Sequence, residues 1–179
     1  AIRYAGMNEL RQVEQWLAMN KAQTFEDWRD ALRMQAFASF NFVYADREGN
    51  TMFVHNSLTP NRVAGYDWTQ YLPGDDSSLI WDSYMPFDDL PQVINPKSGY
   101  IHSANQSPFR VTAESDNPIK ANYRIEDGFP TRMTNRADRG LELFAELGPI
   151  SEQEFSDIKH DKSFSKNSRS MAFLNKLMA

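Results

Sequence analysis

The chain has 179 residues, of which 41% are hydrophobic and 24% are charged, and its net charge is -5. This composition is typical of a folded protein with one core and unlike that of a disordered chain. No cluster of Lys and Arg forms the positive surface that nucleic-acid binding requires, and no apolar run approaches the roughly 20 residues of a membrane span. We therefore expect neither nucleic acid nor a membrane as a partner.

The chain contains no cysteine and three histidines. The lack of cysteine excludes disulfides, a cysteine nucleophile and thiolate metal sites. His55, His102 and His160 are widely separated and do not have the spacing of a zinc site. We interpret all three histidines as structural.

Helical patterning covers the first part of the chain, from about residue 8 to residue 37. Thr24 and Asp27 have the spacing of a capping box, which predicts the start of a second helix. Two apolar stripes at helical spacing are expected to pack into the core. They are Val13, Trp16 and Leu17, and Phe25, Trp28 and Leu32.

A β-hairpin is predicted over residues 41–55. Residues 42–45 and 51–54 are rich in β formers, and the polar segment 46–50 with Gly49 separates them. The two runs show little alternation between polar and apolar residues. We therefore expect strands that are covered on both faces, as in a layered architecture.

Residues 56–131 contain few regular patterns, and all nine prolines of the chain lie between Pro60 and Pro149. Loops of this length are uncommon unless they carry function or pack against other structure. Seven aromatic residues argue for an ordered loop and against a flexible linker. They are Tyr66, Trp68, Tyr71, Trp81, Tyr84, Phe87 and Tyr100.

Helices return over about residues 135–178. The first is expected from Ala137 to Leu147 and ends at Gly148, which suits a helix terminus. Ser151 and Glu154 have the spacing of a second capping box, and two short helices follow, joined by the polar run 162–169. We treat residues 1–179 as a single partial domain.

Common catalytic motifs are missing from the sequence, including the serine elbow G-x-S-x-G, the phosphate loop and the dinucleotide fingerprint. Two pairs of adjacent acids, Asp75 with Asp76 and Asp88 with Asp89, could serve acid-base chemistry. Adjacent acids in a loop rich in Gly and Pro are usually solvated, so we assign them no catalytic role.

Several segments together resemble the penicillin acylase family of N-terminal nucleophile hydrolases, which includes penicillin and acyl-homoserine lactone acylases. The segment from Asn41 to Asp46, followed by Gly49 and Asn50, is similar to the family's strand-turn-strand block. The more specific run is Leu72-Pro-Gly74, Trp81, Met85-Pro-Phe-Asp-Asp-Leu-Pro91, Asn95-Pro96, Ser98-Gly99 and Ala104-Asn105. Further matches are Ala1-Ile-Arg-Tyr4, Pro60-Asn-Arg62 and the Arg-Ala-Asp-Arg segment that ends at Arg139. The resemblance spans nearly the whole chain but corresponds to an internal part of the family's longer catalytic chain.

The resemblance implies an α+β fold that forms part of an αββα sandwich with a long, Pro-rich ordered loop. It also implies that the chain is a fragment of an amide-bond hydrolase in which the hydroxyl of an N-terminal serine is the nucleophile. Residue 1 is Ala1, so we expect the nucleophile portion to be absent and the isolated chain to be inactive. The expected partners are the remainder of the acylase chains and a small N-acyl amide, such as a β-lactam antibiotic or an acyl-homoserine lactone. The family also suggests a periplasmic or secreted location, and its chemistry requires no cofactor.

The same resemblance assigns candidate site residues. Asn105 stands where the family has the asparagine whose side-chain amide stabilises the oxyanion of the tetrahedral intermediate. Arg139 stands where the family has a supporting arginine, and Arg136 is the alternative because helical periodicity does not choose between them. Beside Asn105 the chain has Ala104 and Gln106 where the family often has a second asparagine or an aromatic residue, so the acyl preference is left open.

Asp116 matches a carboxylate that binds structural calcium in some family members. Calcium usually has six to eight oxygen ligands, so most ligands would come from elsewhere, with the backbone around Trp68 as one candidate. The alternative is an aspartate that caps its own loop.

For the chain as a whole, the alternative to the acylase is a noncatalytic binding or structural module derived from the same fold.

Overall fold

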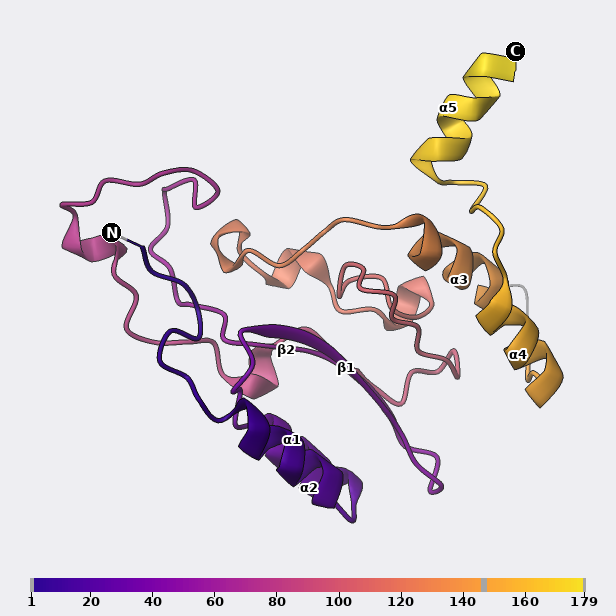
Figure 1. Cartoon of the computed structure of the whole chain (residues 1–179), viewed down its shortest axis with the longest axis horizontal. Coiled ribbons are helices and arrows are strands. Elements are labelled where there is room, and N and C mark those ends of the chain that lie inside the picture. Colours follow the sequence, from indigo (N-terminus) through magenta and orange to yellow (C-terminus); the bar gives the residue numbers. More distant parts are fainter. Residues whose placement is uncertain (1, 146–147, 179) are drawn as a thin grey trace.

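The computed structural model describes residues 2–145 and 148–178 as a mixed α+β structure (Figure 1). Its helices and strands are α1 (Gln12–Lys21), α2 (Phe25–Leu32), β1 (Ser39–Ala45), β2 (Thr51–Ser57), β3 (Gln92–Ile94), α3 (Asn135–Ala145), α4 (Glu152–His160) and α5 (Arg169–Met178). Ala1 and Leu147, which entered the sequence predictions, lie outside the described residues.

The first helical region divides into α1 and α2 at residues 22–24. Thr24 caps α2 by accepting a hydrogen bond from the backbone N–H of Asp27, and the Asp27 carboxylate accepts from the N–H of Thr24 in return. The predicted capping box is therefore confirmed. The predicted stripe of α2 is confirmed as well, because Trp28 and Leu32 are buried and Phe25 packs against the same cluster.

The predicted stripe of α1 is wrong for Val13 and Leu17, whereas Trp16 packs edge-on against Phe37 and Phe42. Val13 is 78% exposed and Leu17 is 52% exposed, whereas Gln15 and Met19 are buried. The reason is a polar anchor: the Gln15 side chain accepts a hydrogen bond from the N–H of Ala36 at 2.7 Å and donates one to Asn56 at 3.2 Å. These bonds turn α1 so that the Gln15 amide faces the sheet together with Met19, which belongs to the core cluster.

The sheet has three antiparallel strands in the order β1-β2-β3 within the described residues. β1 and β2 form the predicted hairpin, and their register places Asn41 opposite His55 and Phe42 opposite Val54. β3 pairs with the other edge of β2, so that β2 is central and almost wholly buried. The short strand β3 lies inside the long loop and was not predicted.

The two faces of the sheet are covered differently. Alternate residues such as Phe42, Met52 and Val54 join the core beneath α1 and α2. On the opposite face, Phe53 packs with Val111 and other residues of the long loop. In Figure 1 the two helices lie on one side of the strands and much of the loop on the other. The described residues thus hold one sheet layer, and a second layer remains a prediction for a larger protein.

β1 is an edge strand, which differs from the expectation that both hairpin strands would be covered. Phe40 is 45% exposed and Val43 is 50% exposed. Within the described residues, only β2 pairs with β1.

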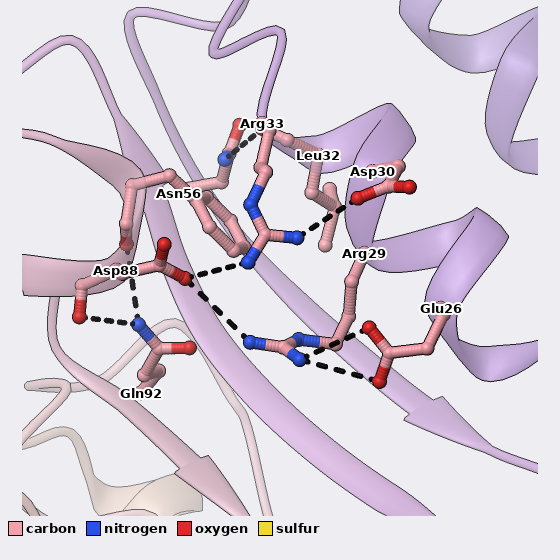
Figure 2. Close-up of polar contacts among 9 residues, drawn as sticks. Glu26, Arg29, Asp30, Leu32, Arg33, Asn56, Asp88 and Gln92 are labelled. Atoms are coloured by element: carbon pink, nitrogen blue, oxygen red, sulfur yellow. Dashed lines mark hydrogen bonds and ion pairs between the residues drawn. The ribbon is translucent and has the colours of Figure 1, made fainter.

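Polar contacts fasten α2 to the sheet and to the loop (Figure 2). The buried side chain of Asn56 on β2 donates to the carbonyl oxygen of Leu32 at 2.9 Å. Asp88 lies 2.9 Å from a guanidinium nitrogen of Arg33 and 3.6 Å from one of Arg29. The helix is therefore held by one buried hydrogen bond and by a more exposed pair of ionic contacts.

The long loop is ordered by contacts between arginine and tryptophan side chains. The guanidinium of Arg62 lies 5.4 Å from the ring centre of Trp68 and 6.0 Å from that of Trp81, while Arg3 lies over Trp81 at 4.8 Å. Arg62 also donates to the carbonyl oxygen of Glu126 at 2.8 Å. Cation–π contacts of this kind tie distant parts of the loop together.

The last three helices are short. Ser151 caps α4 through the predicted capping box with Glu154. α5 has no buried residue among those described, and Figure 1 shows it directed away from the sheet. No helix in residues 2–145 and 148–178 has the combined length and apolar character that a membrane crossing requires.

Candidate functional site

Asn105 lies in a tight turn between the sheet and α3. Its φ angle is 61°, in the left-handed region that costs most residues about 1–2 kcal/mol and that asparagine tolerates better than most. A residue holds this conformation only when its surroundings fix it. The turn around Asn105 is therefore a constrained position.

Gln106 supplies much of that constraint. Its side chain is buried, its Oε1 accepts from the N–H of Ala104 at 2.5 Å, and its Nε2 donates to the carbonyl oxygens of His102 at 2.8 Å and Arg110 at 3.0 Å. One amide thus joins backbone groups on both sides of Asn105. The buried Gln106 side chain therefore holds the two ends of the turn together.

Arg136, on the first turn of α3, holds the Asn105 side chain. One guanidinium nitrogen donates to the Asn105 Oδ1 at 3.2 Å and to the carbonyl oxygen of Ala104 at 3.1 Å. A guanidinium only donates hydrogen bonds, so Oδ1 is the atom that faces Arg136. The Asn105 Nδ2 group, which carries two hydrogens, therefore points away from the arginine.

Asn105 borders a pocket of about 330 Å³ against the loop face of the hairpin. The lining residues are Ser39, Phe40, Asn41, His55, Asn105, Gln106 and Pro130. A donor amide, a histidine and an exposed aromatic ring thus share one open cavity. Such a mixture of apolar surface and a few placed polar groups suits a small organic ligand.

His55 is buried in this site and makes a short contact with Asn41, its partner in the strand register. The His55 Nδ1 and the Asn41 Oδ1 are 2.6 Å apart, and the Asn41 Nδ2 donates to the carbonyl oxygen of Gln106 at 3.4 Å. The carbonyl oxygen can only accept, so the Asn41 Oδ1 must face the histidine, and His55 Nδ1 must carry a hydrogen. His55 Nε2 then accepts from the Ser39 hydroxyl at 3.3 Å.

Burial lowers the pKa of His55 from its usual 6.5 to about 4. Charging an imidazole away from water is unfavourable, because the cation loses its hydration. His55 is consequently neutral near pH 7, in the tautomer that the Asn41 contact requires.

Arg139, the first candidate for the supporting arginine, points elsewhere. It makes two hydrogen bonds to Asp161, at 3.0 and 3.1 Å, which raise the pKa of Arg139 and lower that of Asp161 to about 2. Both residues line a second pocket of about 500 Å³ with residues of α3 and α4. Among the described residues, the arginine that contacts Asn105 is Arg136, the alternative, and the sequence prediction for Arg139 has no such contact to support it.

Asp116 holds its own loop together, because its Oδ2 accepts from the N–H of Ser98 at 2.8 Å. The surrounding backbone of Trp68 was the other proposed contributor to calcium binding, and the Trp68 ring contacts Arg62 and Trp81. The described residues contain no group of three or more His, Cys, Asp or Glu side chains arranged for a metal ion. A calcium site at Asp116 would therefore need further oxygen ligands from outside these residues.

Three polar residues of the site, Asn41, His55 and Gln106, were not assigned to it from the sequence. A signal was present for two of them, because a hairpin that turns over residues 46–50 places Asn41 opposite His55. The role of Gln106 depends on a turn whose shape the sequence does not reveal. All three lie around the one candidate that the sequence did place here, Asn105.

Comparisons with known proteins agree on one family. A family model described as penicillin amidase matches residues 1–177. A penicillin G acylase of Escherichia coli is 34% identical over 108 residues, which are 60% of this chain and 12% of that protein. The solved structure of a thermostable penicillin G acylase from Alcaligenes faecalis matches with a TM-score of 0.65 and 25% identity, covering 84% of this chain and 25% of that one. The chain thus spans a minor part of the length of both relatives.

Proposed function

The chain belongs to the penicillin amidase family, and we propose from this premise that its parent protein hydrolyses amide bonds with Asn105 as an oxyanion donor. The reaction is acyl transfer from an N-acyl amine to a serine hydroxyl, followed by transfer to water. Negative charge develops on the carbonyl oxygen in each step, and a fixed donor in the site stabilises it.

The nucleophile in this proposal is an N-terminal serine outside these 179 residues. The E. coli relative is aligned over only 12% of its length, which leaves ample sequence for that residue. The isolated chain is then inactive, and the remainder of the acylase chains are its partners. The substrates are small N-acyl amides such as β-lactam antibiotics or acyl-homoserine lactones, and the names of both relatives favour penicillin G as the first to test.

Two observations on one residue support the proposal: Arg136 contacts the side-chain oxygen of Asn105, and Asn105 lines a pocket. Arg136 donates a hydrogen bond to the oxygen of the Asn105 amide, so the amide N–H donors lie on the side away from Arg136. Asn105 itself lines the 330 Å³ pocket, where a carbonyl oxygen would find them. The turn is fixed by neighbouring groups of the same chain, so the donor needs little reorganisation during the reaction.

Two further features of the parent protein follow from the family resemblance. We propose a periplasmic or secreted location, and a structural calcium ion to which Asp116 contributes one carboxylate. The chemistry itself uses no cofactor.

The test is Asn105→Ala in the parent protein, with release of the free amine from penicillin G as the measurement. We expect kcat to fall by about 10²–10³, the usual effect of losing one oxyanion donor. Asn8→Ala is the matched control, because Asn8 is also exposed and has a φ angle of 67°. Both changes carry the same backbone cost, and only the first removes the proposed donor.

Wild-type turnover in the Asn105→Ala protein would remove the site assignment. A folded parent protein that hydrolyses no N-acyl amide, and whose reading frame encodes no serine for the N-terminal position, would instead support the noncatalytic module. The two failures are distinguishable because the first concerns one residue and the second the whole protein.

A further inference from the structure

The pocket beside Asn105 contains a continuous set of hydrogen bonds that the proposed chemistry does not use directly. It runs from Ser39 to His55, from His55 to Asn41, and from Asn41 to the backbone of Gln106. Gln106 follows Asn105 in the chain, and its side-chain Oε1 accepts from the N–H of Ala104 across the turn in which Asn105 has its left-handed conformation. The set therefore ends on the residue that holds the proposed donor.

We propose that His55, in its neutral form, is a positioning residue for the oxyanion donor. It holds the donor in place through Asn41 and Gln106. This inference rests on the proposed function of Asn105. In it, His55 transfers no proton and forms no bond to substrate. Its Nδ1–H fixes the Asn41 side chain, Asn41 fixes the Gln106 carbonyl group, and the turn keeps the Asn105 amide directed at the pocket.

The geometry favours this role over simple space filling. His55 lies on a central strand at a position covered by the loop, where an aliphatic residue would pack without the cost of burying a polar ring. The cost of burying the imidazole ring is offset only if both ring nitrogens have hydrogen-bond partners. Both do, because Nδ1 bonds to Asn41 and Nε2 bonds to Ser39. His55 is the buried member of this network, Asn41 is half-buried and Ser39 is exposed, and the bonds of the buried ring fix its arrangement with Asn41.

Neutrality of His55 also matters for the pocket. Arg136 already places one positive charge on the oxygen side of the Asn105 amide. A neutral His55 adds no second positive charge to the site. Its Nε2 atom also remains an acceptor for the Ser39 hydroxyl. Burial of the ring among loop and strand residues, including the edge contact with Phe129 at 5.7 Å, maintains this state.

The experiment compares His55→Leu with His55→Asn in the complete enzyme, with penicillin G as the substrate. Leucine fills the space without a donor, whereas asparagine places an N–H near the position of the imidazole Nδ1. We expect His55→Leu to lower kcat on the order of 10- to 100-fold with KM little changed, because a small displacement of a donor costs up to about 10² in rate. His55→Asn is expected to recover most of the loss. A residue that serves only to fill the core would give the reverse order, since leucine packs better there than asparagine.

A double variant shows whether His55 acts through Asn105. In the Asn105→Ala background the donor is already absent, so His55→Leu should produce no further loss of kcat. Equal losses for leucine and asparagine, or losses that multiply with that of Asn105→Ala, would overturn the inference. If His55→Leu does not fold, Asn41→Ala and the matching double variant with Asn105→Ala give the same comparison. Wild-type kcat in Asn105→Ala alone would reject the proposed function itself, which is a separate result.

Discussion

Burial controls the charge of His55, and the consequence is measurable in the stability of the protein. The pKa of His55 is lowered from 6.5 to about 4, so the unfolded chain binds a proton at a higher pH than the folded protein does. The contribution of neutral His55 to stability is therefore complete above about pH 6.5, is lost as the pH falls to about 4, and changes no further below that.

We expect the free energy of unfolding to fall by roughly 3 kcal/mol between pH 7 and pH 4 because of this one residue. Denaturant unfolding at several pH values checks it, with the difference between wild type and His55→Asn isolating the histidine from the carboxylates. His160→Gln, at an exposed position, is the control for replacing a histidine with an amide side chain. Parallel curves for wild type and His55→Asn would contradict the expectation.

Single residues also show where the sequence was sufficient and where it was not. Asn105 was assigned from an extended pattern of neighbours, and its role as the oxyanion donor stays a prediction. The choice between Arg136 and Arg139 could not be made, because the two lie one turn apart on a helix and their partners, Asn105 and Asp161, come from different parts of the chain. Three-dimensional contacts decide such a choice, and periodicity does not.

At the scale of elements, α2 is attached to the rest of the structure by contacts of unequal strength (Figure 2). Asn56 is fully buried and bonded both to the Leu32 carbonyl group and to the Gln15 amide. The Asp88 side chain, which pairs with two arginines, is 63% exposed. Buried polar groups that lose a partner cost far more than solvated ion pairs that are broken.

Asn56→Ala is therefore expected to lower the free energy of unfolding by about 2–4 kcal/mol, because two buried polar groups lose their partner. Asp88→Ala should cost less than about 1 kcal/mol. Chemical denaturation of both variants beside the wild type gives the comparison. Similar losses for the two would mean that the ionic contacts, and not the buried amide, fasten the helix.

Elements whose signals are local were predicted well. The two capping boxes depend on residues three apart, and the hairpin depends on a turn between two runs of β formers. The buried face of α1 was not predicted, because Gln15 interacts with Asn56 and Ala36, which are distant in sequence. The strand β3 was missed because it is three residues long and exists only through its pairing with β2.

For the whole molecule, the open edge of β1 is the most consequential surface. An unpaired strand with exposed apolar residues is a template for pairing with another chain. The edge of β1 has this character among the described residues, since Phe40 and Val43 are both about half exposed. We expect the isolated 179-residue chain to associate as its concentration rises.

Val43→Lys should reduce that association, because a lysine on an edge strand opposes pairing. Val63→Lys is the matched control, since Val63 is 39% exposed but lies in the loop outside any strand. Light scattering over a range of concentrations measures the effect. A chain that stays monomeric throughout, or that responds equally to both changes, would show that β1 does not drive association.

The predicted mixture of helices and strands is confirmed, whereas the αββα sandwich that the resemblance implies stays a prediction. Layers depend on which surfaces meet, and several of the surfaces here face outward, including the edge of β1 and most of α5. The chain covers only part of the length of each relative, which is consistent with these outward-facing surfaces.

Within the described residues, the turn that carries Asn105 is held by contacts with Gln106, Asn41 and the first turn of α3. An arrangement of this kind separates two tasks that an enzyme must perform. On the proposal that Asn105 is the oxyanion donor, changes elsewhere in the parent protein can alter acyl recognition while this turn stays constant. Libraries that vary other segments around a constant copy of this one would then change the preferred substrate and keep the proposed chemistry.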